Sequence, residues 1–214
     1  MPIILSPYSF APPSLAFQTS ADAATQTITC PTVLAGDVGV LFDQASNNSG
    51  IPSDVIPSGF TKLKTSNPAS SFYRTTLSYK VFTGSEGGGS LTGLSGSFSM
   101  AKVLLVFRPS FVIAAVGVST FLEETTDSNP SSQSIAAAGE AAPLIRLASG
   151  SVGNSATAPA FTTGTFDATV TRVGSNSGIR AGYAIQNTTP SNDTVDIGDN
   201  GSGNILISGW MNFT

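Results

Sequence analysis

The sequence predicts an all-β fold: an antiparallel β-sandwich or jelly-roll-like structure built from two pseudo-repeats of about 100 residues. Charged residues make up only 10% of the 214-residue chain and hydrophobic residues 40%, which suits short strands joined by turns. Apolar segments alternate with Gly-, Pro- and Ser-containing turns along the whole chain, as in sandwiches and barrels. Several of these segments also recur in the same order in the second half.

About five strands are expected in each half. In the first half they lie near residues 14–18, 26–33, 36–45, 72–83 and 101–109. In the second half they lie near residues 111–121, 132–137, 141–148, 165–174 with 178–187, and 204–213. Alternation over 75–82 and 179–186 places one face of each strand on a core and the other toward solvent or a neighbour. The runs Val103–Phe107 and Phe111–Val118 are apolar on both faces, which predicts strands in the middle of a sandwich or under a second layer.

Four features recur at nearly constant spacing. The matched pairs are Gly36-Asp37 with Gly139-Glu140, Pro57–Thr61 with Pro159–Thr162, Tyr79 with Tyr183, and the apolar strands Val103–Phe107 with Ile205–Phe213. The offsets of the first three pairs are 140 − 37 = 103, 159 − 57 = 102 and 183 − 79 = 104 residues. Such regularity predicts an internal duplication.

The repeat divides the chain into an N-terminal arm (1–13), a first β-sandwich half (14–109) and a second half (110–214). Arg108-Pro109-Ser110 is the seam, and three residues without linker composition favour close packing into one unit with pseudo-twofold symmetry. Two separate small sandwiches remain the alternative.

The arm, Met1–Pro13, contains four prolines and several apolar residues, and it has no counterpart in the repeat. We expect it to extend and dock on another subunit, where its apolar groups become buried. The alternative is an arm folded back on its own domain.

The composition excludes several classes of function. The absence of histidine rules out Ser–His–Asp and Cys–His catalysis and His-containing zinc sites. The single cysteine, Cys30, cannot form an internal disulfide and is interpreted as a small buried apolar residue. Nine scattered Lys and Arg in a chain of net charge −4 do not form a nucleic-acid-binding surface. No segment has the length of a membrane helix or the pattern of a signal peptide, so we expect a soluble protein made in a cytoplasm.

The remaining candidates for chemistry each have a simpler interpretation. Glu86, Glu123, Glu124 and Glu140 lie in or beside turns, whereas glycoside hydrolysis needs two carboxyl groups facing each other at ~5–9 Å. The segment Asp193–Gly201 is rich in oxygen ligands but lacks the spacing of an EF-hand, and whether it binds calcium stays open. Four aromatic residues are either core or a sugar-stacking platform: Phe60, Phe72, Tyr73 and Trp210. No catalytic, cofactor-binding or metal-binding residue is assigned.

The order of turns and strands in the first half resembles bacteriophage virion structural proteins of β-sandwich type. The matching residues are Gly36-Asp37, Pro57-Ser58-Gly59-Phe60-Thr61 and Tyr79-Lys80. This chain departs from the pattern at Phe60, where Trp is frequent, and at Ser78, where a second Tyr is frequent. The resemblance implies a head decoration, head-fibre or tail-associated protein, with no active site.

We therefore expect a non-enzymatic structural component of a virion surface, made in the host cytoplasm. It would act by protein–protein contacts with capsid or tail subunits, as a homo-oligomer, and would bind neither nucleic acid nor membrane. The alternative is a receptor- or carbohydrate-binding adhesin, which would use loop aromatics and carboxylates at one end of the sandwich. A carboxylate hydrolase is a third interpretation, which a converging acidic cluster would favour.

Overall fold

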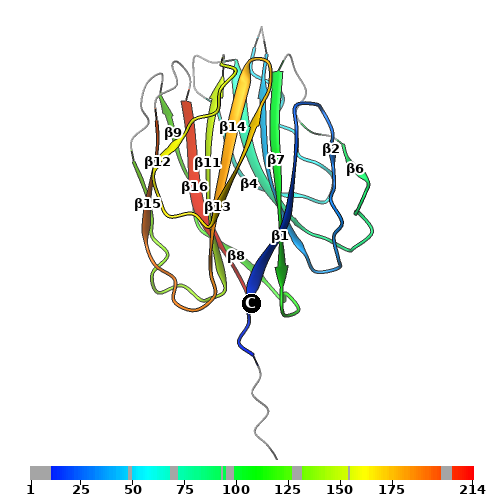
Figure 1. Cartoon of the computed structure of the whole chain (residues 1–214), viewed down its shortest axis with the longest axis vertical. Coiled ribbons are helices and arrows are strands. Elements are labelled where there is room, and N and C mark those ends of the chain that lie inside the picture. The colour runs from blue at the N-terminus through cyan, green and yellow to red at the C-terminus, as the bar shows by residue number, and fades with distance from the viewer. Residues whose placement is uncertain are drawn as a thin grey trace, which may run out of the picture.

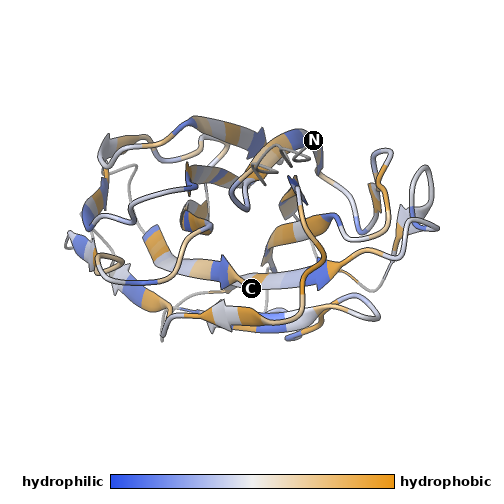
Figure 2. Cartoon of the chain, turned by 90° about the horizontal axis from the view of Figure 1, so that it is seen from below, coloured by the Kyte–Doolittle hydropathy of each residue, from blue (hydrophilic) through white to orange (hydrophobic). Residues whose placement is uncertain are grey.

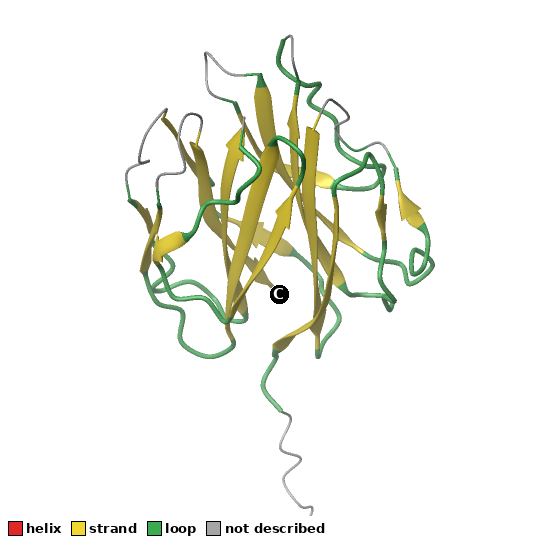
Figure 3. Cartoon of the chain, turned by 45° about the horizontal axis from the view of Figure 1, so that its top comes forward, coloured by secondary structure: helices red, strands yellow, loops and turns green. Residues whose placement is uncertain are grey.

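The computed structural model describes residues 11–47, 50–67, 72–92, 94, 99–126, 132–153, 155–198 and 204–214. This part of the chain contains strands and loops but no helix, and every strand pair is antiparallel (Figure 3). The predicted all-β class is thus confirmed. The strands are β1 (Leu15–Ala23), β2 (Ile28–Thr29), β3 (Val38–Ser46), β4 (Thr61–Ser66), β5 (Tyr73–Val81), β6 (Ser90–Leu91), β7 (Ser99–Pro109), β8 (Val116–Val118), β9 (Leu122–Thr126), β10 (Gln133–Ile135), β11 (Leu144–Gly153), β12 (Phe161–Thr163), β13 (Ala168–Val173), β14 (Ser177–Gln186), β15 (Asp193–Ile197) and β16 (Asn204–Phe213).

Two large sheets lie face to face (Figures 1 and 2). The first has the order β1-β7-β3-β5-β4, and all its strands come from residues before the seam. The second has the order β13-β14-β11-β16-β8, with β9 also paired to β16, and its strands come from residues after the seam. Each half of the sequence therefore supplies one layer of the sandwich.

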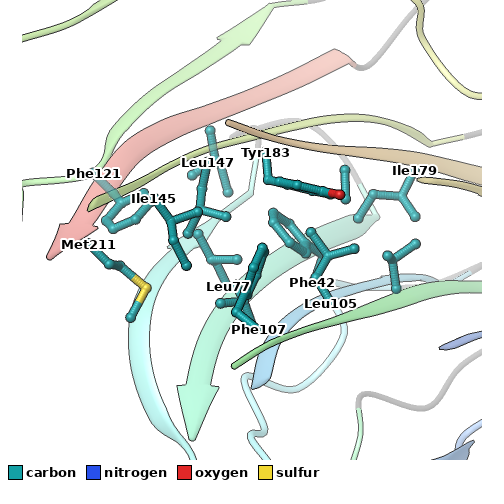
Figure 4. Close-up of a cluster of buried hydrophobic side chains, with 14 of the residues drawn as sticks. Phe42, Leu77, Leu105, Phe107, Phe121, Ile145, Leu147, Ile179, Tyr183 and Met211 are labelled. Atoms are coloured by element: carbon teal, nitrogen blue, oxygen red, sulfur yellow. The ribbon is translucent and has the colours of Figure 1, made fainter. Parts of the chain in front are cut away.

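A single cluster of buried side chains fills the space between the two sheets (Figure 4). Alternate residues of β3 and β7, among them Phe42 and Phe107, point toward the second sheet because side chains alternate across a strand. The Tyr183 ring meets Phe107 edge-to-face, with ring centroids 5.1 Å apart. The hydrophobic core is thus shared between the two halves.

Additional layers cover the outer faces of both sheets. The two-stranded sheet β2–β6 covers the first sheet, and an outer cluster beneath it includes Leu41, Leu104 and Val106. A small sheet, β10-β15-β12, belongs to the corresponding cluster over the second sheet. The central strands β3 and β11 are buried at every position for this reason. Thr76 and Ser78 of β5, which sequence alternation had placed toward solvent or a neighbour, are also buried.

The two halves share one strand order. Reading from β4 and from β13, the orders β4-β5-β3-β7-β1 and β13-β14-β11-β16-β8 match element by element. The long-range pairing β2–β6 corresponds to β10–β15, and Phe60 and Phe161 both pack in the outer clusters. This correspondence supports the duplication, which itself stays a prediction.

An ion pair joins the two sheets at each edge of the sandwich. Asp22 of β1 accepts from Arg172 of β13 at 2.8 Å, and Glu123 of β9 lies 3.4 Å from Lys64 of β4. In the matched strand order β1 corresponds to the β8–β9 edge and β4 to β13. The two acidic residues therefore come from corresponding strands, and so do the two basic residues.

The apolar run Phe111–Val118 is not a buried central strand, so that expectation was wrong. Only Val116–Val118 form a strand, and Val112 is 92% exposed. The run follows the end of β7, and its partly buried residues Phe111, Ile113 and Val116 pack against the central core. Five of the strands described were not predicted, because they are short or lie at sheet margins: β4, β6, β9, β12 and β15.

Candidate functional site

Glu86, the first of the four candidate carboxylates, is held by local contacts. Glu86 accepts hydrogen bonds from the backbone N–H groups of Thr83 (3.1 Å) and Gly84 (3.0 Å), and its carboxylate lies 2.9 Å from Lys80 Nζ. Burial opposes its ionisation, but the hydrogen bonds from Lys80 and Thr83 outweigh it and lower the pKa of Glu86 to about 2. It is therefore an ionised turn-stabilising group.

The other three carboxylates belong to two separate elements. Glu123 pairs with Lys64 across the sandwich, and Glu124 follows it on the opposite face of β9. Glu140 lies in the turn before β11, where its N–H donates to the carbonyl of Ala137. Within the described ranges, no three Asp, Glu or Cys side chains lie together in a way that could hold a metal ion.

The four aromatic residues do not form a platform. Phe60 is buried in the outer cluster of the first sheet, and Tyr73 is buried in the central core. Trp210 packs against the outer cluster of the second sheet, where its Nε1–H donates to the carbonyl of Ala136 at 3.0 Å. Phe72 is exposed at the start of β5. The platform interpretation was wrong because the strand order distributes these residues over separate layers.

The oxygen-rich segment Asp193–Gly201, whose binding of calcium the sequence left open, is largely a strand, β15. Asp193 accepts from Arg146 NH1 at 3.0 Å and from the N–H of Thr165 at 2.8 Å. Asp196 Oδ1 accepts from the N–H of Ile197. Residues 199–201 lie outside the described residues. The described carboxylates of this segment thus already have protein partners.

A buried ion pair escaped the sequence analysis. Lys102 of β7 and Asp43 of β3 are cross-strand neighbours on the outer face of the first sheet, and the Lys102 Nζ donates to Asp43 Oδ1. Both side chains are inaccessible to solvent. Burial lowers the pKa of Lys102, and the Asp43 charge opposes this shift. The only signal in the sequence was one acidic and one basic residue within largely apolar strands. That the two residues pair can be known only from the register of β3 against β7.

An apolar hollow lies at the end of the sandwich next to the seam, and we call it the seam groove. Its volume is about 410 Å³. It is lined by Leu34, Ala35, Gly36, Asp37, Val81, Arg108, Pro109, Phe111, Val112 and Ile113. Three of its large apolar side chains are exposed to solvent: Leu34 (53%), Val81 (37%) and Val112 (92%).

The polar groups of the seam groove are paired with one another. Arg108 forms a two-pronged contact with Asp37, with Nε–Oδ1 and NH2–Oδ2 distances of 2.7 Å. The N–H of Leu34 donates to the same carboxylate at 2.8 Å. Burial opposes ionisation of Asp37, but these hydrogen bonds outweigh it and lower its pKa. The groove therefore presents an apolar surface over a satisfied charge pair.

A smaller hollow of about 180 Å³ lies beside Trp210. Hydroxyl-bearing residues, Ser119, Thr120 and Ser134, form part of its wall. A partly exposed indole next to hydroxyl groups is suited to a sugar ring, although the Ser119 hydroxyl already accepts from the N–H of Trp210.

Comparisons with protein-family models, with curated proteins and with solved structures find no match to this chain. In the portion of the chain that the structure describes, no helix is long and apolar enough to cross a membrane.

Proposed function

We propose that this chain is a non-enzymatic structural component of a phage virion surface, such as a capsid decoration, head-fibre or tail-associated protein. The observation that carries the proposal is the seam groove. Clustered exposed apolar side chains mark sites where another protein binds, and Leu34, Val81 and Val112 line one hollow. The resemblance in the first half supplies the class of assembly.

Contact with neighbours would occur at the ends of the sandwich rather than by strand addition at its edges. The edge strand β4 carries Lys62 and Lys64 and a bulge between them. Charged side chains and bulges are features that protect sheet edges from pairing with another chain. The ion pairs Asp22–Arg172 and Lys64–Glu123 further tie each edge to the opposite sheet.

The test is immunogold electron microscopy of purified phage particles with an antibody raised against the full chain. We expect label at a regular position on the head or tail. Absence of label on intact particles, with the chain detected only outside them in the same lysate, would contradict the proposal.

The adhesin is the second candidate, and the hollow beside Trp210 favours it. A glycan array tests it with the full chain and with Trp210→Ala. Binding to a defined sugar that the substitution abolishes would support the adhesin; equal signals from both proteins would reject this site.

A further inference from the structure

We propose that the seam groove of one copy receives the N-terminal segment, residues 1–10, of a neighbouring copy of this chain. The inference rests on the proposed function, because it requires copies of the chain that assemble. It adds which segment and which surface join them. Both the anchor of the segment and the surface of the groove support it.

The start of β1 is fixed beside the groove. The N–H of Ser110 donates to the carbonyl of Ser14 at 2.8 Å, and the N–H of Ser14 donates to Ser110 Oγ at 3.0 Å. The Asn187 side chain brackets Leu15, accepting from its N–H at 2.7 Å and donating to its carbonyl at 3.0 Å. Phe111, the residue after Ser110, already lines the groove. The segment before Ser14 thus begins from a rigid anchor at the groove margin.

The direction of the chain at this anchor points to another molecule. Residues 11–13 are exposed or nearly so, and Figure 1 shows them leading away from the sandwich. Pro12 and Pro13 fix φ near −65° and favour an extended backbone. Ten further residues, if extended at about 3.1 Å each, would span roughly 31 Å.

The chemistry of the segment matches the groove. Residues 1–10 have no charged side chain and include Ile3, Ile4, Leu5, Tyr8 and Phe10. Both oxygens of the Asp37 carboxylate are already paired with Arg108, so an apolar segment can displace water there without leaving this carboxylate unsatisfied. Pro2 and Pro7 reduce the conformational entropy lost on docking.

A cysteine pair in the full chain tests whether the contact is between copies. Leu5→Cys with Val112→Cys should form covalent dimers or larger species under mild oxidation on a non-reducing gel. The native Cys30 is buried and does not interfere. Each single variant is the control for random cross-linking. A disulfide closed within one monomer would overturn the proposal in favour of a folded-back arm, and a double variant that cross-links no more than the singles would overturn it entirely.

Self-association provides an independent readout by light scattering across a concentration series. Val112→Asp and Leu5→Asp should each weaken association about tenfold or more. The double variant should weaken it no further, because the two substitutions remove the same contact. Val173→Asp, at an exposed valine of β13 away from the groove, is the matched control. Association that neither Val112→Asp nor Leu5→Asp weakens would overturn the inference. Particle labelling tests the proposed function separately, so either can fail alone.

Discussion

The buried pair Lys102–Asp43 leads to a prediction about stability. The corresponding position in the second half of the molecule shows which uncharged residues the fold accepts there. Corresponding positions follow from the register: Tyr79 pairs with Val40 in the first sheet, and Tyr183 pairs with Leu147 in the second. Three residues further along the central strands, Asp43 faces Lys102, whereas Gly150 faces Leu206. The fold therefore accommodates an uncharged pair at the same place.

Removing one member of the pair takes away the opposite charge from the other, which stays buried. Lys102→Leu should cost about 3–5 kcal/mol of the free energy of unfolding. The double variant Lys102→Leu/Asp43→Ala should recover most of this loss, because apolar replacements of a buried pair are often neutral or stabilising. Urea unfolding of the full chain, followed by Trp210 fluorescence, measures both values.

The Asp43→Ala variant adds a dependence on pH. Burial already lowers the pKa of Lys102 below its ordinary value of 10.5, and loss of Asp43 removes the charge that opposes this shift. Between the folded and unfolded pKa the unfolded state binds more protons, so the stability of this variant should rise with pH by at most about 1.4 kcal/mol per unit. A cost below about 1 kcal/mol for Lys102→Leu, or a double variant as unstable as that single one, would refute the reasoning.

Three other predictions concern stability and reactivity. Because the pKa of Glu86 is about 2 when folded against 4.5 in its ordinary state, its stabilisation should be complete above pH 4.5 and lost toward pH 2. The difference in unfolding free energy between the native chain and Glu86→Gln should therefore shrink as the pH falls from 4.5 toward 2. A difference that stays constant over this range would contradict the prediction. Gly153→Ala places a methyl group against the buried Tyr73 ring and should cost about 1–3 kcal/mol by urea unfolding, whereas Gly198→Ala, with its nearest neighbour at 3.4 Å, should cost less. Burial, followed by the nearby charge of Glu86, raises the pKa of Cys30, so a thiol reagent should label the chain only after denaturation; rapid labelling of the folded chain would contradict the burial.

The sequence predicts the fold better than the site. The apolar run Val103–Phe107 identifies the central strand β7, and the alternation around Tyr79 and Tyr183 identifies β5 and β14, because hydrophobic periodicity is local. The same criterion failed at Phe111–Val118, since an apolar run does not state whether another layer covers it.

Sites that depend on register were not predictable. The seam groove combines residues near 35, 81 and 110, which only the strand order brings together. The Lys102–Asp43 pair likewise depends on the exact alignment of β3 with β7. The seam itself was visible as Pro109, and the structure ends β7 at that residue.

The division of the sandwich into one sheet per half has a consequence during synthesis. The first sheet is complete once residue 109 has been made, yet the surface formed by Phe42, Leu105 and Phe107 faces the second sheet. The remaining 214 − 109 = 105 residues take roughly 5–20 s at about 5–20 residues per second. For that interval the apolar inner face of the first sheet has no partner on the same chain, so the first half is open to aggregation until the second half has been made.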